Sequence, residues 1–141
     1  MTTGPLSENG NWLCPEATQG LIAQFEGDLG DVTDARLAAG LCLDSLAHHD
    51  PPASPESRGD ILLVITELAA AAVRRAPGPF TVRLRRTLDG VHVAVEGTRP
   101  ALPRPTRHVD GLGRQIVRSL SRHVSVSRDP RRQEIHALLP W

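Results

Sequence analysis

Glu67 is a carboxylate, a residue type that can act in binding or in acid–base chemistry. It follows an unbroken apolar run at residues 61–65, so it lies well inside one long helix. Gly111 and Gly113 form a second candidate, because glycines at this spacing let the backbone approach a phosphate closely. The same pair also fits a tight turn that opens a helix, and both interpretations stay open.

A run of arginines follows these glycines at helical spacing. Arg114, Arg118 and Arg122 recur every four residues, so we predict that they stack on the outer face of one helix. The planar guanidinium group of arginine suits carboxylates and phosphates, and this stripe is therefore a candidate contact for an acidic partner. A solvated helix face is an equally good interpretation.

The segment from Glu67 to Ala76 resembles the nucleotide-binding helix of the histidine-kinase-type ATPases (the Bergerat, or GHKL, fold). It is most similar to the small bacterial anti-sigma-factor serine kinases, whose members read roughly Glu-Leu-x-x-Asn-Ala-Val-x-His-Ala at this point. The positions that match this pattern are Glu67, Leu68, Ala72, Val73 and Ala76. The expected order of elements also resembles that of the family from about residue 21 onward, so the resemblance covers nearly the whole chain.

The resemblance implies an ATP site, and this chain departs from it at several positions. Ala71 replaces the magnesium-binding asparagine of the family and has no oxygen to offer a hard cation. Arg75 replaces the usual histidine, and Gly97 replaces the aspartate that binds adenine. Glu96 is adjacent to Gly97 but should point to the opposite face of its strand, because side chains alternate along a strand. The threonine that supports adenine binding in the family aligns with Glu134.

These departures change the function that the resemblance implies. Losing a polar partner at a specific hydrogen-bonding site costs about 1–3 kcal/mol, so two losses weaken ATP binding by roughly two to four orders of magnitude if they add. Glu67 resembles the general base or water-orienting residue of the family and would then be vestigial. Gly111 and Gly113 would keep part of the phosphate site. We therefore expect neither ATP nor Mg²⁺ as a cofactor, and a pseudokinase-like regulatory protein rather than an enzyme.

Protein partners of two kinds are implied by the resemblance: a sigma factor and an anti-anti-sigma protein of the STAS type. The candidate contacts are the arginines of the stripe and those of the loop before it: Arg114, Arg118, Arg122, Arg99, Arg104 and Arg107. The resemblance is also consistent with a homodimer. We expect no nucleic-acid partner, because a chain without tyrosine and with few other aromatic residues offers few stacking platforms.

Three alternative functions stay open. The chain could be an active ATP-dependent serine/threonine kinase and anti-sigma factor, with ATP and Mg²⁺ bound in a site that tolerates the replacements. It could bind nucleic acid through its basic half, which would require a steep salt dependence. It could also bind another small molecule in the vacated site, where Arg75 would meet an anion.

Charge is divided unevenly between the two halves of the 141-residue chain. Residues 1–70 carry eleven acidic residues against Arg36 and Arg58, whereas residues 71–141 carry fourteen arginines against five acidic residues. Either the two halves pack against each other, or the basic half presents a face to an acidic partner.

Nothing in the sequence indicates a membrane, a secretory route or a metal. No run of about 18 apolar residues occurs, and residues 1–5 lack the features of a signal peptide. Cys14 and Cys42 are too far apart for a metal-ligand motif and form no disulfide framework. His48 and His49 fit a helix C-terminus better than a metal site. We therefore expect a cytoplasmic protein with no metal site.

Residues 1–19 are predicted to form a mobile tail, and residues 20–141 a histidine-kinase-like ATPase domain. In the domain we predict an edge strand at residues 21–25 and a helix that Thr33 or Asp34 caps, with Leu37 and Leu41 on its apolar face. Ser54 would cap a second helix that ends near residue 76.

The rest of the chain predicts further strands and one more helix. We expect a hairpin at residues 80–96 with its turn at Asp89-Gly90 and an irregular loop at residues 97–110. A helix at residues 111–122 and two strands that flank a turn at Asp129-Pro130 complete the pattern. Ile116, Val117 and Leu120 would face inward from that helix. Helices would cover one face of a mostly antiparallel sheet, which is an α+β two-layer sandwich.

Overall fold

The computed structural model describes residues 12–13, 20–75, 78–98 and 108–141. At residues 12–13, 75 and 108–112 it describes the backbone only. In this part of the chain the strands are β1 (Trp12–Leu13), β2 (Gly20–Phe25), β3 (Phe80–Thr87), β4 (Gly90–Thr98), β5 (His123–Arg128) and β6 (Arg132–Leu139). The helices are α1 (Gly30–His49), α2 (Ser57–Arg75) and α3 (His108–Leu120).

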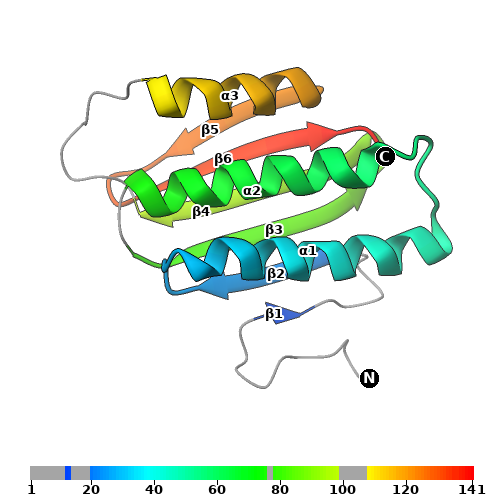
Figure 1. Cartoon of the computed structure of the whole chain (residues 1–141), viewed down its shortest axis with the longest axis horizontal. Helices are drawn as coiled ribbons and strands as arrows, with labels where there is room; N and C mark the ends of the chain where they lie inside the picture. Colours follow the sequence, from blue (N-terminus) through cyan, green and yellow to red (C-terminus); the bar gives the residue numbers. More distant parts are fainter. Residues whose placement is uncertain (1–11, 14–19, 76–77, 99–107) are drawn as a thin grey trace.

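All the described strands belong to one antiparallel sheet with the order β1-β2-β3-β4-β6-β5. The three helices lie on the same face of this sheet, with α1 over β2, α2 over the central strands and α3 beside β5 (Figure 1). The predicted α+β class, with an antiparallel sheet covered on one face by helices, is confirmed. None of the described helices has the length and apolarity needed to cross a membrane.

The core lies between α2 and the valine-rich face of β4. Residues at helical spacing on one side of α2 are buried, among them Ile61, Val64, Ile65, Leu68 and Ala69. They meet Val91, Val93 and Val95 of β4, where alternate side chains point to the helix layer and are buried. A buried aliphatic side chain contributes roughly 1.5–3 kcal/mol relative to an exposed one, so this layer supplies much of the driving force for folding.

The apolar face predicted for α1 is wrong at two positions. Leu37 and Leu41 are 62% and 64% exposed, whereas Ala39 and Leu43 are fully buried. Residues four apart share one side of a helix, so Leu37 and Leu41 form a pair on the side that α1 turns away from the sheet. The helix is apolar on both sides, and only its packing decides which side is buried.

Both long helices begin at residues other than the predicted caps. α1 begins at Gly30, before Thr33, and the Asp31 carboxylate accepts hydrogen bonds from the Gly27 and Asp28 N–H groups at 2.9 Å each. α2 begins at Ser57, three residues after the predicted cap Ser54. The ends of α1 at His49 and of α2 at Arg75 agree with the prediction.

Both predicted hairpins form, but the first turn lies one residue before the predicted Asp89-Gly90. β3 and β4 pair from Thr81↔Glu96 to Thr87↔Gly90, so the loop between them is Leu88-Asp89 and Gly90 is the first residue of β4. In the second hairpin the Asp129 carboxylate accepts hydrogen bonds from the N–H groups of Arg131 and Arg132 at 2.8 and 2.7 Å. The predicted turn at Asp129-Pro130 is therefore closed by its own aspartate.

One edge of the sheet differs from the expected arrangement. Trp12 and Leu13 of β1 pair with Ala23 and Ile22, so β2 is not the outermost strand along that stretch. The remainder of the predicted tail, residues 1–11 and 14–19, lies outside the described residues. The same is true of residues 99–107, most of the predicted loop.

The C-terminal tryptophan is tied to the end of α1. Trp141 is 7% exposed, and its Nε1–H donates to the Asp50 carbonyl oxygen at 2.6 Å. The Asp50 carboxylate accepts a hydrogen bond from Arg86 Nε of β3, also at 2.6 Å. Asp50 therefore joins α1, β3 and residue 141 at one end of the sheet.

Gly90 and Gly59 should respond in opposite ways to alanine. Gly90 has a φ of 149°, and a Cβ there would collide with the Leu139 carbonyl oxygen of β6. We expect Gly90→Ala to lower the free energy of unfolding by about 1–3 kcal/mol. Gly59 lies in α2 with open space around it, so Gly59→Ala should raise this free energy by up to about 1 kcal/mol. Urea denaturation measures both, and equal effects of the two substitutions would contradict the assignment.

Candidate functional site

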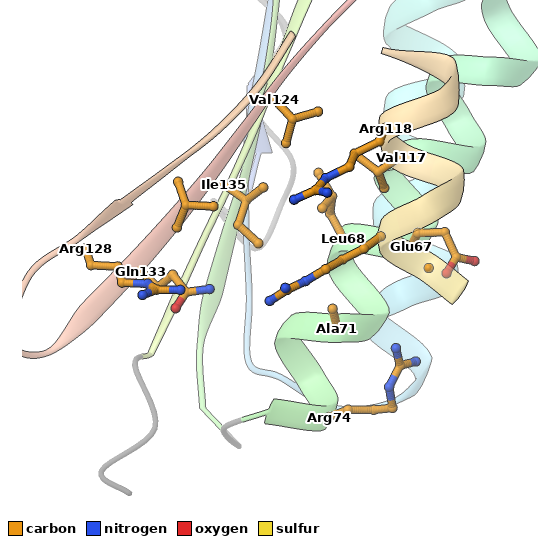
Figure 2. A pocket seen from close by; sticks show the side chains of 13 residues that line it. Glu67, Leu68, Ala71, Arg74, Val117, Arg118, Val124, Arg128, Gln133 and Ile135 are labelled. Carbon is orange, nitrogen blue, oxygen red and sulfur yellow. The ribbon is translucent and has the colours of Figure 1, made fainter. Parts of the chain in front are cut away.

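A cleft of about 250 Å³ lies between α2, α3 and the strands β5 and β6 (Figure 2). Every one of these elements contributes side chains to it, at one- or two-turn spacing from the helices and at alternate positions from the strands. The lining residues are Glu67, Leu68, Ala71, Arg74, Gly113, Arg114, Val117, Arg118, Val124, Val126, Arg128, Gln133 and Ile135. The cleft therefore joins the helix that carries Glu67 to the helix that carries the arginine stripe.

The inner wall of the cleft is apolar. Leu68 and Val117 are buried, and Val124 and Ile135 pack against the core from the strand side. These four side chains come from α2, α3, β5 and β6, so the wall exists only in the folded chain. It can accommodate the apolar body of a ligand or of a partner side chain.

The rim of the cleft is strongly basic. Arg74, Arg114, Arg118 and Arg128 all line it, and Glu67 is the one acidic residue among the described lining residues. In Figure 2, Arg118 extends from α3 and Arg128 from β5, and the two side chains point into the cleft from opposite walls. Such a rim favours anionic groups, since guanidinium donors pair well with carboxylates and phosphates.

Glu67 lies close to the backbone of α3. A Cβ added to Gly113 would come within 2.8 Å of Glu67 Oε1, so the carboxylate occupies the space that this glycine leaves. In Figure 2 the carboxylate points away from Arg118 and Arg128. Glu67 is therefore placed on the rim of the cleft, where it faces α3 more than the interior.

Positions 71 and 97 approach the site from two sides. Ala71 lines the cleft from α2. Gly97 lines a small neighbouring cavity of about 20 Å³, which shares Leu68, Gln133 and Ile135 with the cleft. A Cβ at Gly97 would lie 3.5 Å from the Ala72 Cβ and 3.8 Å from the Phe80 Cβ, which are ordinary contacts. A Cβ at position 97 would therefore fit and would face the helix layer.

Glu96 and Glu134 both lie on the other face of the sheet. Glu96 pairs with Arg132 at 3.1 Å, and the Glu134 carboxylate pairs with Arg83. The expectation that Glu96 points away from the site agrees with this geometry. Glu134 therefore does not face the cleft, and the expectation that placed it in the site is wrong.

Arg74 and Arg128 line the cleft but were not predicted as site residues, and the same is true of Gln133. Gln133 lines both cavities from β6 and is opposite Gly97 in the register of β4 and β6. The alternation of Gln133, Ile135, Ala137 and Leu139 along this strand could have identified it. Those residues share one face of β6, and the apolar members identify that face as the buried one.

Gly111 and Gly113 do not form a turn. Both lie inside α3, which begins at His108 and ends at Leu120. Beyond the first turn of a helix, each N–H donates to the carbonyl oxygen four residues earlier, so the Gly113 N–H is not free to bind a phosphate. The predicted helix start at residue 111 is also wrong, because α3 begins at His108. Gly113 instead provides room for Glu67.

The arginine stripe is divided by the end of α3. Arg114 and Arg118 are exposed and line the cleft, whereas Arg122 follows the helix, and its backbone N–H donates to the Leu138 carbonyl oxygen at 2.7 Å. The prediction that all three arginines stack on the outer face of one helix is therefore wrong. The side chain of Arg75 lies outside the described part of the chain, as do Arg99, Arg104 and Arg107.

The inward face predicted for α3 is largely confirmed. Val117 is buried, and Leu120 packs against the core, whereas Ile116 is half-buried.

The described lining residues offer few ligands to a magnesium ion. Glu67 and Gln133 are the only lining side chains there that carry an oxygen atom, and Ala71 offers none. Mg²⁺ requires several oxygen ligands in octahedral geometry, and four arginines oppose a divalent cation at this rim. Among the described residues no group of three or more histidine, cysteine or acidic side chains could hold a metal ion.

Comparison with known proteins adds no family. No family model matches the chain, and no curated protein sequence matches it significantly.

Gly113→Ala tests whether glycine is needed at this site. Glu67 Oε1 is the end of a flexible side chain and can move away from a new Cβ, while alanine inside a helix is favoured over glycine by up to about 1 kcal/mol. We expect the free energy of unfolding to stay equal or to rise. Urea denaturation, with Gly59→Ala as the helical control, measures the effect. A loss of more than about 1 kcal/mol would indicate that the Glu67 carboxylate is held in place and cannot move away from the new Cβ.

Proposed function

We propose that this chain is a regulatory protein with the Bergerat ATPase fold, in which a degenerate nucleotide site no longer supports kinase chemistry. It acts by binding proteins, and the resemblance of residues 67–76 to anti-sigma-factor serine kinases suggests a sigma factor or a STAS-type anti-anti-sigma protein as the partner. The observation that carries the proposal is the composition of the cleft. Arginines line it, and position 71 offers no oxygen to a metal.

The positions of the cleft residues support an origin as a nucleotide site. Ala71 and Gly97 stand where the resemblance implies the metal asparagine and the adenine aspartate, and they face the same region between α2 and the sheet. Neither offers a polar side-chain atom. The arrangement of three helices on an antiparallel sheet is that expected of the Bergerat fold.

The basic rim supports binding of an acidic protein surface. Arg114 and Arg118 are exposed on α3, and Arg128 is exposed on β5. These arginines surround an apolar wall, and a ring of polar residues around an apolar centre is typical of protein interfaces. Charged residues at such a rim act mainly on the rate of association and on the choice of partner.

Replacing the two lost groups should create measurable ATP binding. We expect no heat of binding when the wild type is titrated with millimolar Mg·ATP. Ala71→Asn with Gly97→Asp restores a metal ligand and an adenine acceptor, each worth about 1–3 kcal/mol. The double variant should bind ATP roughly a hundredfold or more tightly than the wild type, and calorimetry with and without Mg²⁺ measures this.

Ala70→Asn is the matched control for this titration. Ala70 neighbours Ala71 on α2 but is not among the residues that line the cleft, so its substitution should leave ATP binding undetectable. A micromolar dissociation constant for the wild type would overturn the proposal and favour an active kinase. Failure of the double variant to bind ATP would count against a nucleotide-site origin.

Partner binding should occur without ATP and should depend on the basic rim. The immobilised protein, incubated with the sigma factors and STAS proteins of its own genome, should retain one of them in nucleotide-free buffer. Arg114→Glu with Arg118→Glu should weaken retention at least tenfold, because two attractive charges become repulsive. Arg36→Glu on α1 is the control, since Arg36 is exposed and does not line the cleft. Retention that requires ATP, or that only Arg36→Glu disrupts, would contradict the proposal.

A further inference from the structure

The sheet face that carries no helix holds a hydrogen-bonded row of titratable side chains. His92 Nε2 of β4 and His136 Nδ1 of β6 lie 3.0 Å apart, and the two rings stack with their centroids 5.1 Å apart. His136 Nε2 lies 3.2 Å from Glu134 Oε1, and the Glu134 carboxylate also pairs with Arg83 of β3. The row therefore runs from a carboxylate through two imidazoles to an open end at His92.

The carboxylate determines the direction of the hydrogen bonds along this row. When His136 donates from Nε2 to Glu134, its neutral ring can only accept at Nδ1. His92 must then donate from Nε2, which leaves His92 Nδ1 without a hydrogen as an acceptor. A proton that arrives at the row is held at His92 Nδ1, where it creates a new donor.

Arg85 is the unbalanced cation of this face. It pairs with His92 in the register of β3 and β4, and no ion pair or hydrogen bond joins its side chain to the described residues. Arg83 is paired with Glu134, and Arg132 is paired with Glu96. Arg85 therefore contributes one uncompensated positive charge beside the open end of the histidine row.

A hollow of about 360 Å³ lies over these residues. It is lined by Ile22, Ala94, Arg83, Arg85, His92 and His136, with parts of residues 20, 21 and 84. Ala94 is only 1% exposed although it points to this face, because the larger side chains around it close over its methyl group. A cavity of about 150 Å³ can hold a benzene ring, so the hollow has room for an oxyanion with a small apolar substituent.

We propose that this hollow binds a small phosphate monoester, with Arg85 and His92 as the ligands of the phosphate and with uptake of one proton at His92 Nδ1. A phosphate monoester near neutral pH carries close to two negative charges, since its second pKa is about 6. Arg85 supplies one balancing charge and the protonated histidine row supplies the second. A carboxylate or a sulfonate has a single charge, which Arg85 alone balances.

The surroundings of the row keep it neutral until an anion arrives. Burial lowers the pKa of His92, and the charges of His136, Arg85 and Arg83 lower this pKa further. Burial and then Arg83 lower the pKa of His136. Because both pKa values fall below the ordinary value of about 6.5, the neutral form of the free row predominates at pH 7. A dianion beside Arg85 favours the protonated row and raises the pKa of His92.

Among the described residues of this face outside the row, His123 of β5 is the other histidine, and Leu138 of β6 lies between it and His92 in the register of the strands. β2 contributes Ile22 and Gln24, neither of which titrates, and β5 contributes His123, Ser125 and Ser127 beyond β6. The charged residues that remain, Glu96 and Arg132, are paired with each other. Binding should therefore tighten as the pH falls from about 8 to about 7. It should weaken below about pH 6, where the phosphate loses its second charge.

Calorimetry with phenyl phosphate tests this proposal, and benzenesulfonate serves as a singly charged ligand of similar shape. Titrations at pH 7 in two buffers of different ionisation enthalpy give the number of protons taken up. We expect about one proton for phenyl phosphate and none for benzenesulfonate. Arg85→Gln should weaken phenyl phosphate binding roughly tenfold or more, whereas His92→Gln should abolish the proton uptake.

Arg118→Gln shows whether phenyl phosphate binds in the arginine-lined cleft on the opposite face instead. Loss of binding in Arg118→Gln but not in Arg85→Gln would overturn the proposal, as would equal affinities for the two ligands without proton uptake. Arg85→Lys keeps the charge but not the planar fork, so it provides a second variant if Arg85→Gln unfolds. The ATP titrations test the cleft on the helix-covered face of the sheet. The phosphate proposal and the proposed function can therefore fail independently of each other.

Discussion

The packing of α2 onto the central strands is the interaction on which the rest of the structure depends. Ile61, Ile65 and Leu68 are buried there against the valines of β4. This contact sets the distance and the direction of the helix relative to the sheet. Because Ala72 and Gly97 are both small, the last turns of α2 approach β4 closely. The same approach brings position 71 beside the strands and thereby creates the floor of the cleft.

The two faces of the sheet carry different chemistry because side chains alternate along each strand. The helix-covered face is apolar and leads to a cleft with a basic rim. The other face carries ion pairs, a histidine row and a second hollow. Neighbouring residues therefore serve different sites: Gln133 belongs to the cleft and Glu134 to the histidine row. Arginine occurs on both faces, and the excess of positive charge in the C-terminal half is spread over both rather than gathered on one surface.

Elements with a strong local pattern could be predicted from the sequence. α2 combines a long apolar run with prolines on both sides, and the hairpins have alternating residues around short polar turns. Where the pattern is weak, the buried side or the bounds of an element could not be predicted. α1 has leucine or alanine on both of its sides, so periodicity alone could not show that Leu37 and Leu41 are exposed. Glycines inside α3 suggested a turn, whereas packing against α2 offsets their low helix propensity.

The sequence by itself determined the α+β class, the order of the main elements, the presence of both hairpins and the residue types at positions 71 and 97. These properties depend on neighbours within a few residues, so periodicity and turn chemistry reveal them. Only the tertiary structure decided which arginines meet across the cleft, that Glu67 lies against Gly113, and that His92 and His136 form a row with Glu134. Those contacts join residues far apart in the chain, and their geometry follows from how helices and strands pack rather than from any local pattern.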